Sequence, residues 1–131
     1  MQTEYSLVNS SKGYSQCHDF LKSNGMKHSG FTFPTIMAKR EGEVIGVLGT
    51  IPLKNVVVAG PLWVSVAGNG SFVAIRIIEA YDNVMRNAGL TMYYFSVEKD
   101  NPKWLSLIRK MDTEELDDND PELFWFKRTL Q

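Results

Sequence analysis

The order of hydrophobic and polar positions divides the chain into short alternating stretches and three stretches with helical spacing. The first stretch, Glu4–Val8, predicts a strand. Large side chains then recur at the i, i+3, i+4 and i+7 positions of one helix face: Tyr14, Cys17, His18 and Leu21. Ser10 or Ser11 can cap the start of this helix, and the Asn24-Gly25 pair predicts its end.

The next part of the chain is typical of β-structure. Ile36–Glu41 and Val44–Thr50 predict two strands that are joined by a hairpin turn at Gly42. Asn55–Ala59 and Leu62–Val66 then predict two further stretches of strand, one on each side of a Gly-Pro pair. We therefore expect two or three consecutive strands here.

A long helix and a strong strand follow. A loop at Gly68–Ser71 opens the helix, and Asn87 to Gly89 supply its stop signal. Its apolar stripe has helical spacing and consists of Val73, Ile77, Ala80, Val84 and Ala88. Met92–Val97 carries aromatic side chains on both faces, which predicts a central strand that is buried on both sides.

The last third of the chain predicts one more helix and a strand pair. Asp100-Asn101-Pro102 marks the helix start, since proline suits a first turn. The expected buried face of this helix consists of Trp104, Leu107, Ile108 and Met111. Glu114–Leu116 and Leu123–Leu130 predict two strands around a turn at Asp117–Pro121. The resulting order, β-α-ββ(β)-α-β-α-ββ, predicts the α/β fold class with a central mixed sheet flanked by helices.

Composition and charge narrow the class of protein. A length of 131 residues predicts a single domain over residues 1–131. Fourteen basic and fifteen acidic side chains give a net charge of −1, so we expect neither a nucleic-acid nor a membrane partner. One cysteine and two histidines exclude a disulfide framework and a zinc site built on several thiolates, and we expect no metal. No apolar run approaches the roughly 18 residues that span a bilayer, and the N-terminal pattern is not that of a secretory signal, so we expect a cytoplasmic protein.

Three segments carry a resemblance to a known family: IMAKREGEVIGVLG, SVAGNGSFVAIRIIEAYDNVMRNAG and FSVEKDNPKWLSLIRKM. They resemble, in this order, a strand hairpin, a pyrophosphate loop with its long helix, and a fifth strand with its following helix in the GNAT superfamily of acyl-CoA-dependent N-acyltransferases. The resemblance covers the chain from Tyr5 to Leu130 and implies a GNAT-like fold. The compact, motif-poor form looks like GNAT-like chains that are encoded by tailed phages.

This resemblance implies a site for acetyl-CoA or another acyl-CoA. The fourth and fifth strands would splay apart, so that the acyl-pantetheine arm pairs with strand backbone in the gap. The N–H groups at the start of the long helix would bind the pyrophosphate, and a backbone N–H of the fourth strand would stabilise charge on the reacting carbonyl. The residues that the resemblance assigns to the cofactor are Val64, Val66, Asn69, Gly70, Ser71, Phe72, Val73, Ala74 and Asn101.

The pyrophosphate loop departs from the family's pattern. Counting back from Gly89 places the pattern Arg/Gln-x-x-Gly-x-Gly/Ala on residues 69–74. Only Ala74 conforms, because Asn69 replaces the arginine or glutamine and Phe72 replaces the first glycine. A Cβ and a ring at that position should hinder the approach of a pyrophosphate to the backbone.

The catalytic groups depart from it as well. The family's general acid, a tyrosine on the helix after the fifth strand, corresponds to Ile108, which cannot protonate a thiolate. Glu98 is the candidate general base if it lies in the cleft, and a solvated strand-end carboxylate is the alternative. Asn101 either forms hydrogen bonds near the cofactor or caps the following helix. Tyr93 and Tyr94 are either a substitute acid or core aromatics.

Three further features have both a functional and a structural interpretation. Cys17 beside His18 suggests a nucleophile, but adjacent helical residues point about 100° apart, which favours a buried thiol. The segment Asp112–Glu122 carries seven of the fifteen acids and predicts either a cation or basic-partner site or a solvated turn. The run Phe124–Phe126 places at least one aromatic on an outer face, which predicts a homo-oligomer or protein contact through the C-terminal strand.

Two functions therefore stay open. The first is an N-acyltransferase, dependent on acetyl-CoA, whose acceptor is an amine of a small molecule or a peptide. The second is a GNAT-fold binding or assembly protein without catalysis, for example a viral one. Both require a slot between Leu62–Val66 and Met92–Val97 that points toward the amino end of the Val73–Ala88 helix.

Overall fold

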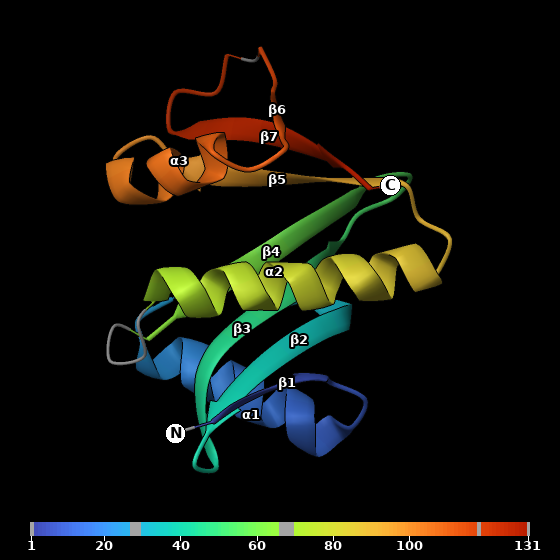
Figure 1. Cartoon of the computed structure of the whole chain (residues 1–131), viewed down its shortest axis with the longest axis vertical. Helices are drawn as coiled ribbons and strands as arrows, with labels where there is room; N and C mark the ends of the chain where they lie inside the picture. The colour runs from blue at the N-terminus through green and yellow to red at the C-terminus, as the bar shows by residue number, and fades with distance from the viewer. Residues whose placement is uncertain (1, 27–29, 66–69, 118, 131) are drawn as a thin grey trace.

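The computed structural model describes residues 2–26, 30–65, 70–117 and 119–130 (Figure 1). The elements follow the expected order along the chain. They are β1 (Thr3–Leu7), α1 (Ser11–Ser23), β2 (Thr32–Arg40), β3 (Glu43–Pro52), β4 (Val57–Val64), α2 (Gly70–Asn87), β5 (Met92–Glu98), α3 (Pro102–Arg109), β6 (Glu114–Glu115) and β7 (Leu123–Thr129).

All seven strands belong to one sheet in the order β1-β2-β3-β4-β5-β7-β6. Every pair of neighbouring strands is antiparallel except β4 and β5, which are parallel. The expected α/β class with a central mixed sheet is confirmed. None of the helices within the described ranges is long and apolar enough to cross a membrane.

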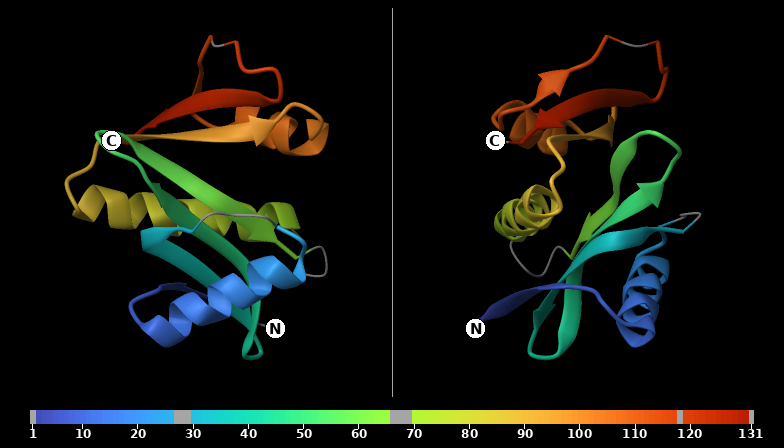
Figure 2. Two further views of the ribbon diagram at one scale, coloured as in Figure 1. Left: turned by 180° about the vertical axis from the view of Figure 1, so that it is seen from behind. Right: turned by 90° about the vertical axis from the view of Figure 1, so that its right-hand side faces the viewer.

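Helices cover the two faces of this sheet unequally (Figure 2). On one face, α1 buries Cys17 and Leu21 against residues of β2 and β3. Ser10 caps α1 as expected, because its Oγ accepts a hydrogen bond from the N–H of Gly13 at 3.1 Å. On the other face, α2 lies over the middle strands and α3 packs beside it over β5 and β7.

The long helix α2 buries a stripe that differs in part from the expected one. Val73, Ile77, Tyr81 and Met85 are fully buried at four-residue steps. Ala88, which was expected to end the stripe, is exposed because it lies beyond the last turn of the helix. The predicted loop is also shorter, since Gly70 and Ser71 belong to the helix.

The two stretches predicted around the Gly-Pro pair form one strand, β4. Leu62 pairs with Leu48 and Ala59 pairs with Thr50, so Gly60 and Pro61 together stand opposite Gly49. This is a β-bulge, which lets the strand continue past a proline that has no N–H to donate to the ladder.

The prediction that β5 is buried on both faces is wrong. Tyr93 and Val97 are buried beneath α2 and α3, whereas Met92, Tyr94 and Ser96 on the alternate face are only half-buried. The reason is that α1 packs on β2 and β3, and no described helix covers β5 on this face. In α3 the fully buried residues are Leu105 and Ile108, so Leu105 replaces Trp104 and Leu107 at the centre of its inward face.

The predicted strand pair at the C-terminus is confirmed as β6 and β7. Phe126 is buried, and the ring of Phe124 contacts two cations, with Lys99 Nζ 5.0 Å and Arg109 Cζ 5.2 Å from its ring centroid. Trp125 is half-buried, and its indole N–H lies 3.3 Å from Asp120 Oδ2. The contact of this strand with a partner stays a prediction.

Candidate functional site

The sheet opens between its two parallel strands. Val58 and Tyr94 form the one register pair between β4 and β5 in the described part of the chain. Beyond this pair the two strands diverge toward their carboxyl ends (Figure 1). The edge of β4 that faces β5 therefore has no strand partner from Ala59 onward. The expected slot is confirmed, and α2 begins at the end of the molecule where it widens.

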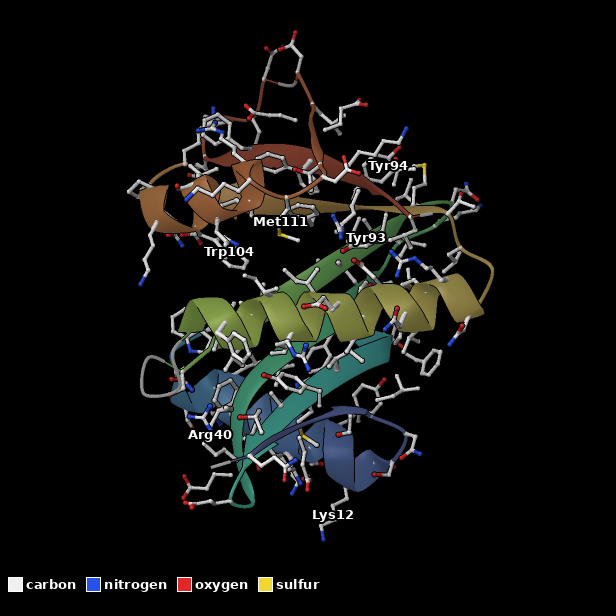
Figure 3. All side chains as sticks on the ribbon, in the orientation of Figure 1. Lys12, Arg40, Tyr93, Tyr94, Trp104 and Met111 are labelled. Carbon is white, nitrogen blue, oxygen red and sulfur yellow. The ribbon has the colours of Figure 1, made fainter. Side chains whose placement is uncertain are left out.

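A pocket of about 290 Å³ fills this opening. Most of its lining is apolar and comes from β3, β4, β5 and α3. Trp104, Met111 and Tyr93 lie in the space between α2 and the C-terminal strands (Figure 3). The lining also includes the bulge residues Gly60 and Pro61. A slender, largely apolar ligand fits such a pocket better than a highly charged one.

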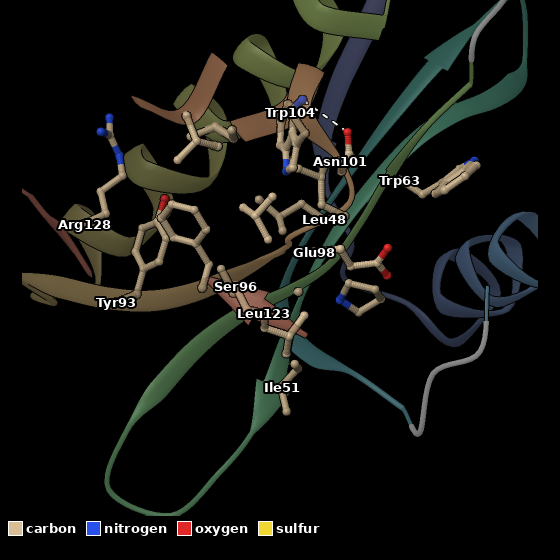
Figure 4. A pocket seen from close by; sticks show the side chains of 18 of the residues that line it. Leu48, Ile51, Trp63, Tyr93, Ser96, Glu98, Asn101, Trp104, Leu123 and Arg128 are labelled. Carbon is tan, nitrogen blue, oxygen red and sulfur yellow. Dashed lines mark hydrogen bonds between the residues drawn. The ribbon is translucent and has the colours of Figure 1, made fainter. Parts of the chain in front are cut away.

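Two charged side chains are among the described residues that line the pocket, and they lie at opposite ends of it (Figure 4). Arg128 is held by Asp82 of α2, with Nε 2.9 Å from Oδ2. The carboxylate of Glu98 is exposed and forms no hydrogen bond or ion pair with a described residue. Glu98 is therefore the lining carboxylate that is available to a ligand.

Asp82 is the centre of a buried polar cluster at the closed end of the slot. It is 1% exposed, and its Oδ1 accepts a hydrogen bond of 2.8 Å from the hydroxyl of Tyr93. Burial, followed by the neighbouring Asp82 carboxylate, raises the pKa of the Tyr93 phenol. Tyr93 therefore stays protonated and bonded to Asp82, and it is a core residue instead of a free acid.

The same cluster extends to the middle of the sheet. The ring of Tyr81 meets that of Tyr93 edge-on at 5.2 Å, and its hydroxyl lies 2.7 Å from Thr50 Oγ1. Burial raises the pKa of Tyr81 to about 12, so this phenol also stays neutral. The cluster joins α2 to β3, β5 and β7, the strands on both sides of the opening.

Of the residues assigned to the cofactor, those of β4 and α2 that the structure describes lie toward the widening end of the slot. Val64 ends β4 and packs on the α2 core, so its backbone alone is available at the strand edge. Gly70 and Ser71 begin α2, and Val66 and Asn69 lie outside the described residues. The side chains of Val73 and Ala74 are buried, so this part of α2 offers a ligand N–H groups only.

Phe72 is the residue of this segment whose side chain is placed where a ligand can meet it. It lies in the first turn of α2 and is 57% exposed. Its ring therefore points away from the core, near the N–H groups that a pyrophosphate would approach. The hindrance of a pyrophosphate by Phe72 stays a prediction.

Asn101 and Ile108 take the positions expected from the sequence. Asn101 caps α3, since its Oδ1 lies 3.2 Å from the backbone N of Trp104, and it also lines the pocket. Ile108 lines the pocket with 1% of its surface exposed. Ser96 and Tyr93 carry the hydroxyl groups among the described lining residues.

Several lining residues were not found from the sequence, above all Trp63, Met26 and Trp104. The sequence indicated only the face on which Trp63 lies, because side chains alternate along a strand and Trp63 therefore points to the face opposite to that of Val64. For Met26 there was no such indication, since it lies just after α1 and reaches the pocket only through the path of the chain.

Cys17 and His18, two further candidates from the sequence, pack in or beside the core. Cys17 is fully buried, and burial raises its pKa to about 11, so the thiol is unreactive at neutral pH. His18 stacks on Phe31 at 4.5 Å. Asp120 accepts hydrogen bonds from the backbone N–H groups of Glu122 and Leu123, at 2.9 and 3.1 Å, which stabilise the turn before β7. These bonds, that to Glu122 first, lower the pKa of the Asp120 carboxyl. A cation or a basic partner of the acidic segment stays a prediction.

Solved structures identify the architecture. The chain is similar to a probable acetyltransferase from Staphylococcus epidermidis, with 8% identity, a TM-score of 0.77 and coverage of 99% of this chain and 100% of that one. An acetyltransferase of the GNAT family from Staphylococcus aureus matches with 10% identity, a TM-score of 0.76 and coverage of 99% and 100%. PaiA N-acetyltransferase from Thermoplasma acidophilum, solved in complex with coenzyme A, matches with 11% identity, a TM-score of 0.75 and coverage of 98% and 99%.

No family model matches the sequence, and no curated protein matches it. At these identities the likeness shows the fold. This chain has the GNAT fold over nearly its whole length, which confirms the resemblance seen in its segments.

Proposed function

We propose that this chain is an acyl-CoA-dependent N-acyltransferase. The observation that carries the proposal is the slot between β4 and β5, which are parallel neighbours paired at Val58 and Tyr94. The slot holds a mostly apolar pocket of about 290 Å³. The GNAT fold and the coenzyme A bound to one of its structural neighbours support acyl-CoA as the ligand.

The slot suits an acyl-pantetheine arm. Such an arm is narrow and carries amide groups, and the unpaired edge of β4 presents backbone N–H and C=O groups along Ala59–Val64. Pro61 within this edge has no N–H, so the backbone donors toward a thioester carbonyl come from its neighbours. The first turn of α2 lies at the wide end and offers N–H groups to the cofactor's phosphates.

We assign the role of general base to Glu98. It ends β5, lines the pocket and has no partner among the described residues. In the proposed reaction the amine nitrogen forms a bond to the acyl carbon, the carbon–sulfur bond breaks, and the sulfur keeps its electron pair. Glu98 takes the proton from the nitrogen and returns it to water. A thiol has a pKa near 8.5, so the sulfur leaves as thiolate without an acid at the position of Ile108.

A second function is supported by that same position. Ile108 is buried where the family places its acid, and Phe72 stands at the loop glycine. A GNAT-fold protein that binds a CoA-type ligand without transferring its acyl group needs neither a general acid at position 108 nor a loop glycine at position 72. The two functions share the slot and differ only in turnover.

Acetyl-CoA should stabilise the protein against unfolding. At 100 times its dissociation constant, a ligand that binds the folded state alone adds about 2.7 kcal/mol. The measurement is the thermal midpoint against acetyl-CoA concentration up to the millimolar range, with adenosine alone as the control ligand. Absence of a shift at every concentration would contradict both functions. A shift without release of free thiol in the presence of amines supports the non-catalytic function.

Replacing Phe72 by glycine should tighten the complex with acetyl-CoA, by up to about tenfold, because the first turn of α2 then admits a closer approach of phosphate. Phe72→Ala is the matched control, since it removes the ring and keeps the Cβ. We expect its affinity to lie between those of the wild type and Phe72→Gly. Titration calorimetry measures all three. Weaker binding by Phe72→Gly than by the wild type would show that the ring contacts the ligand.

A further inference from the structure

The pocket is lined from both faces of the sheet, and some of its lining residues lie on the face that α2 and α3 do not cover. Leu62 and Val64 of β4 pack on the α2 core, so Trp63 between them points to the opposite face. Val97 of β5 is buried with Leu105 and Ile108 of α3, so Glu98 points to that opposite face as well. Figure 4 shows Trp63 and Glu98 at the same end of the pocket.

The surroundings of these two side chains on the open face are mostly apolar. Leu123 stands directly opposite Glu98 in the β5–β7 ladder. Ile51 follows Val47 and Gly49 on the α1 side of β3, and Met26 packs against the α1 cluster. Ile51, Met26 and Leu123 line the pocket together with Trp63, which is 37% exposed. A ligand on this face therefore meets one carboxylate, the hydroxyl of Ser96 and four apolar side chains.

Two further carboxylates among the described residues near Glu98, those of Asp100 and Glu122, are exposed, but neither of them lines the pocket. Asp120, the acid of the nearby turn, accepts hydrogen bonds from two backbone N–H groups and from Trp125. Lys99, next to Glu98 in the chain, lies over the ring of Phe124. Glu98 is the one carboxylate among the described lining residues.

We infer that the acceptor is a primary amine joined to an uncharged apolar group, such as a free amino terminus followed by an apolar side chain. This inference rests on the proposed function. The ammonium group meets the carboxylate of Glu98, and the apolar group packs on Trp63, Ile51 and Leu123. An acceptor with a second ammonium group places that charge against apolar side chains, where it loses water without gaining a partner.

Three amides of single amino acids test this selectivity, since they share the amine and differ in the side chain. With acetyl-CoA, we expect kcat/KM for leucinamide to exceed that for glycinamide, and that for lysinamide to be at least about tenfold below leucinamide. Trp63→Ala should bring leucinamide down to the level of glycinamide. Val56→Ala, at an exposed apolar residue outside the pocket, is the matched control and should preserve the order.

A binding measurement separates this inference from the proposed function. The binding of each amine is measured by its thermal shift in the presence of coenzyme A. Preferential, Trp63-dependent binding of leucinamide without acetyl transfer supports the acceptor class and overturns the transferase. Acetyl transfer with lysinamide equal to or better than leucinamide overturns the acceptor class and supports the transferase. Absence of amine binding overturns the inference, whatever acetyl-CoA does.

Discussion

Glu98→Gln should lower the rate of acetyl transfer by about 10²–10⁴-fold, the range that a positioned general base contributes. The amide keeps the shape of the carboxylate and one acceptor oxygen, but it cannot take a proton from the acceptor amine. Because Glu98 is exposed, the variant should fold as well as the wild type. The measurement is kcat at saturating acetyl-CoA, with leucinamide as acceptor.

Two controls sharpen this result. Glu122→Gln changes a nearby exposed carboxylate that does not line the pocket, and it should leave kcat within about twofold of the wild type. The stabilisation of Glu98→Gln by acetyl-CoA should equal that of the wild type, because Glu98 is proposed to act on the amine. Unchanged turnover in Glu98→Gln would remove this residue as the base.

Asp82→Ala should lower the free energy of unfolding by about 3–5 kcal/mol, the range for removing one partner of a buried ion pair. The substitution leaves the Arg128 guanidinium, whose side chain is 16% exposed, without its carboxylate. It also leaves the buried hydroxyl of Tyr93 without its acceptor. For a domain of this length the thermal midpoint should fall by about 10–20 °C. Urea unfolding followed by circular dichroism gives the free energy, and the thermal scan gives the midpoint.

An exposed pair supplies the comparison. Arg109 and Glu115 form a salt bridge of 3.1 Å with side chains 50% and 42% exposed. Glu115→Ala should therefore cost no more than about 1 kcal/mol. A similar small loss for Asp82→Ala would mean that solvent reaches the buried cluster and that the cluster does not hold the two sides of the slot.

The helices were predicted from sequence patterns that act over short distances along the chain. The spacing of Cys17 and Leu21, the Ser10 cap and the Asn101-Pro102 pair each act within one or two turns, and the structure confirms the helices they predict. The opening beside Tyr94 was inferred from a resemblance of the element order to a family. The sequence has no local signal for the incomplete burial of one face of β5, because this burial depends on where α1 packs. It has none for the continuation of β4 across the bulge either, because this depends on how β3 pairs with β4.

The interior of the site was beyond local patterns. Asp82 lies in an ordinary helical segment, and its partner Arg128 is 46 positions away in the sequence. Trp63 and Glu98 come from different strands and share a pocket only because β4 and β5 are adjacent and parallel. Partners that are far apart in the sequence leave no periodicity, so they were found only from the folded chain.

The pairing at Val58 and Tyr94 makes the middle of the sheet a seam. Across most sheets, rotating one side against the other breaks a row of backbone hydrogen bonds. Here side chains form most of the contacts between the β1–β4 side and the β5–β7 side. Asp82 of α2, for example, accepts hydrogen bonds from Tyr93 of β5 and Arg128 of β7. Side-chain packing between β4 and β5 therefore sets the width of the opening. We expect substitutions at this boundary to change that width while the outer strands keep their registers.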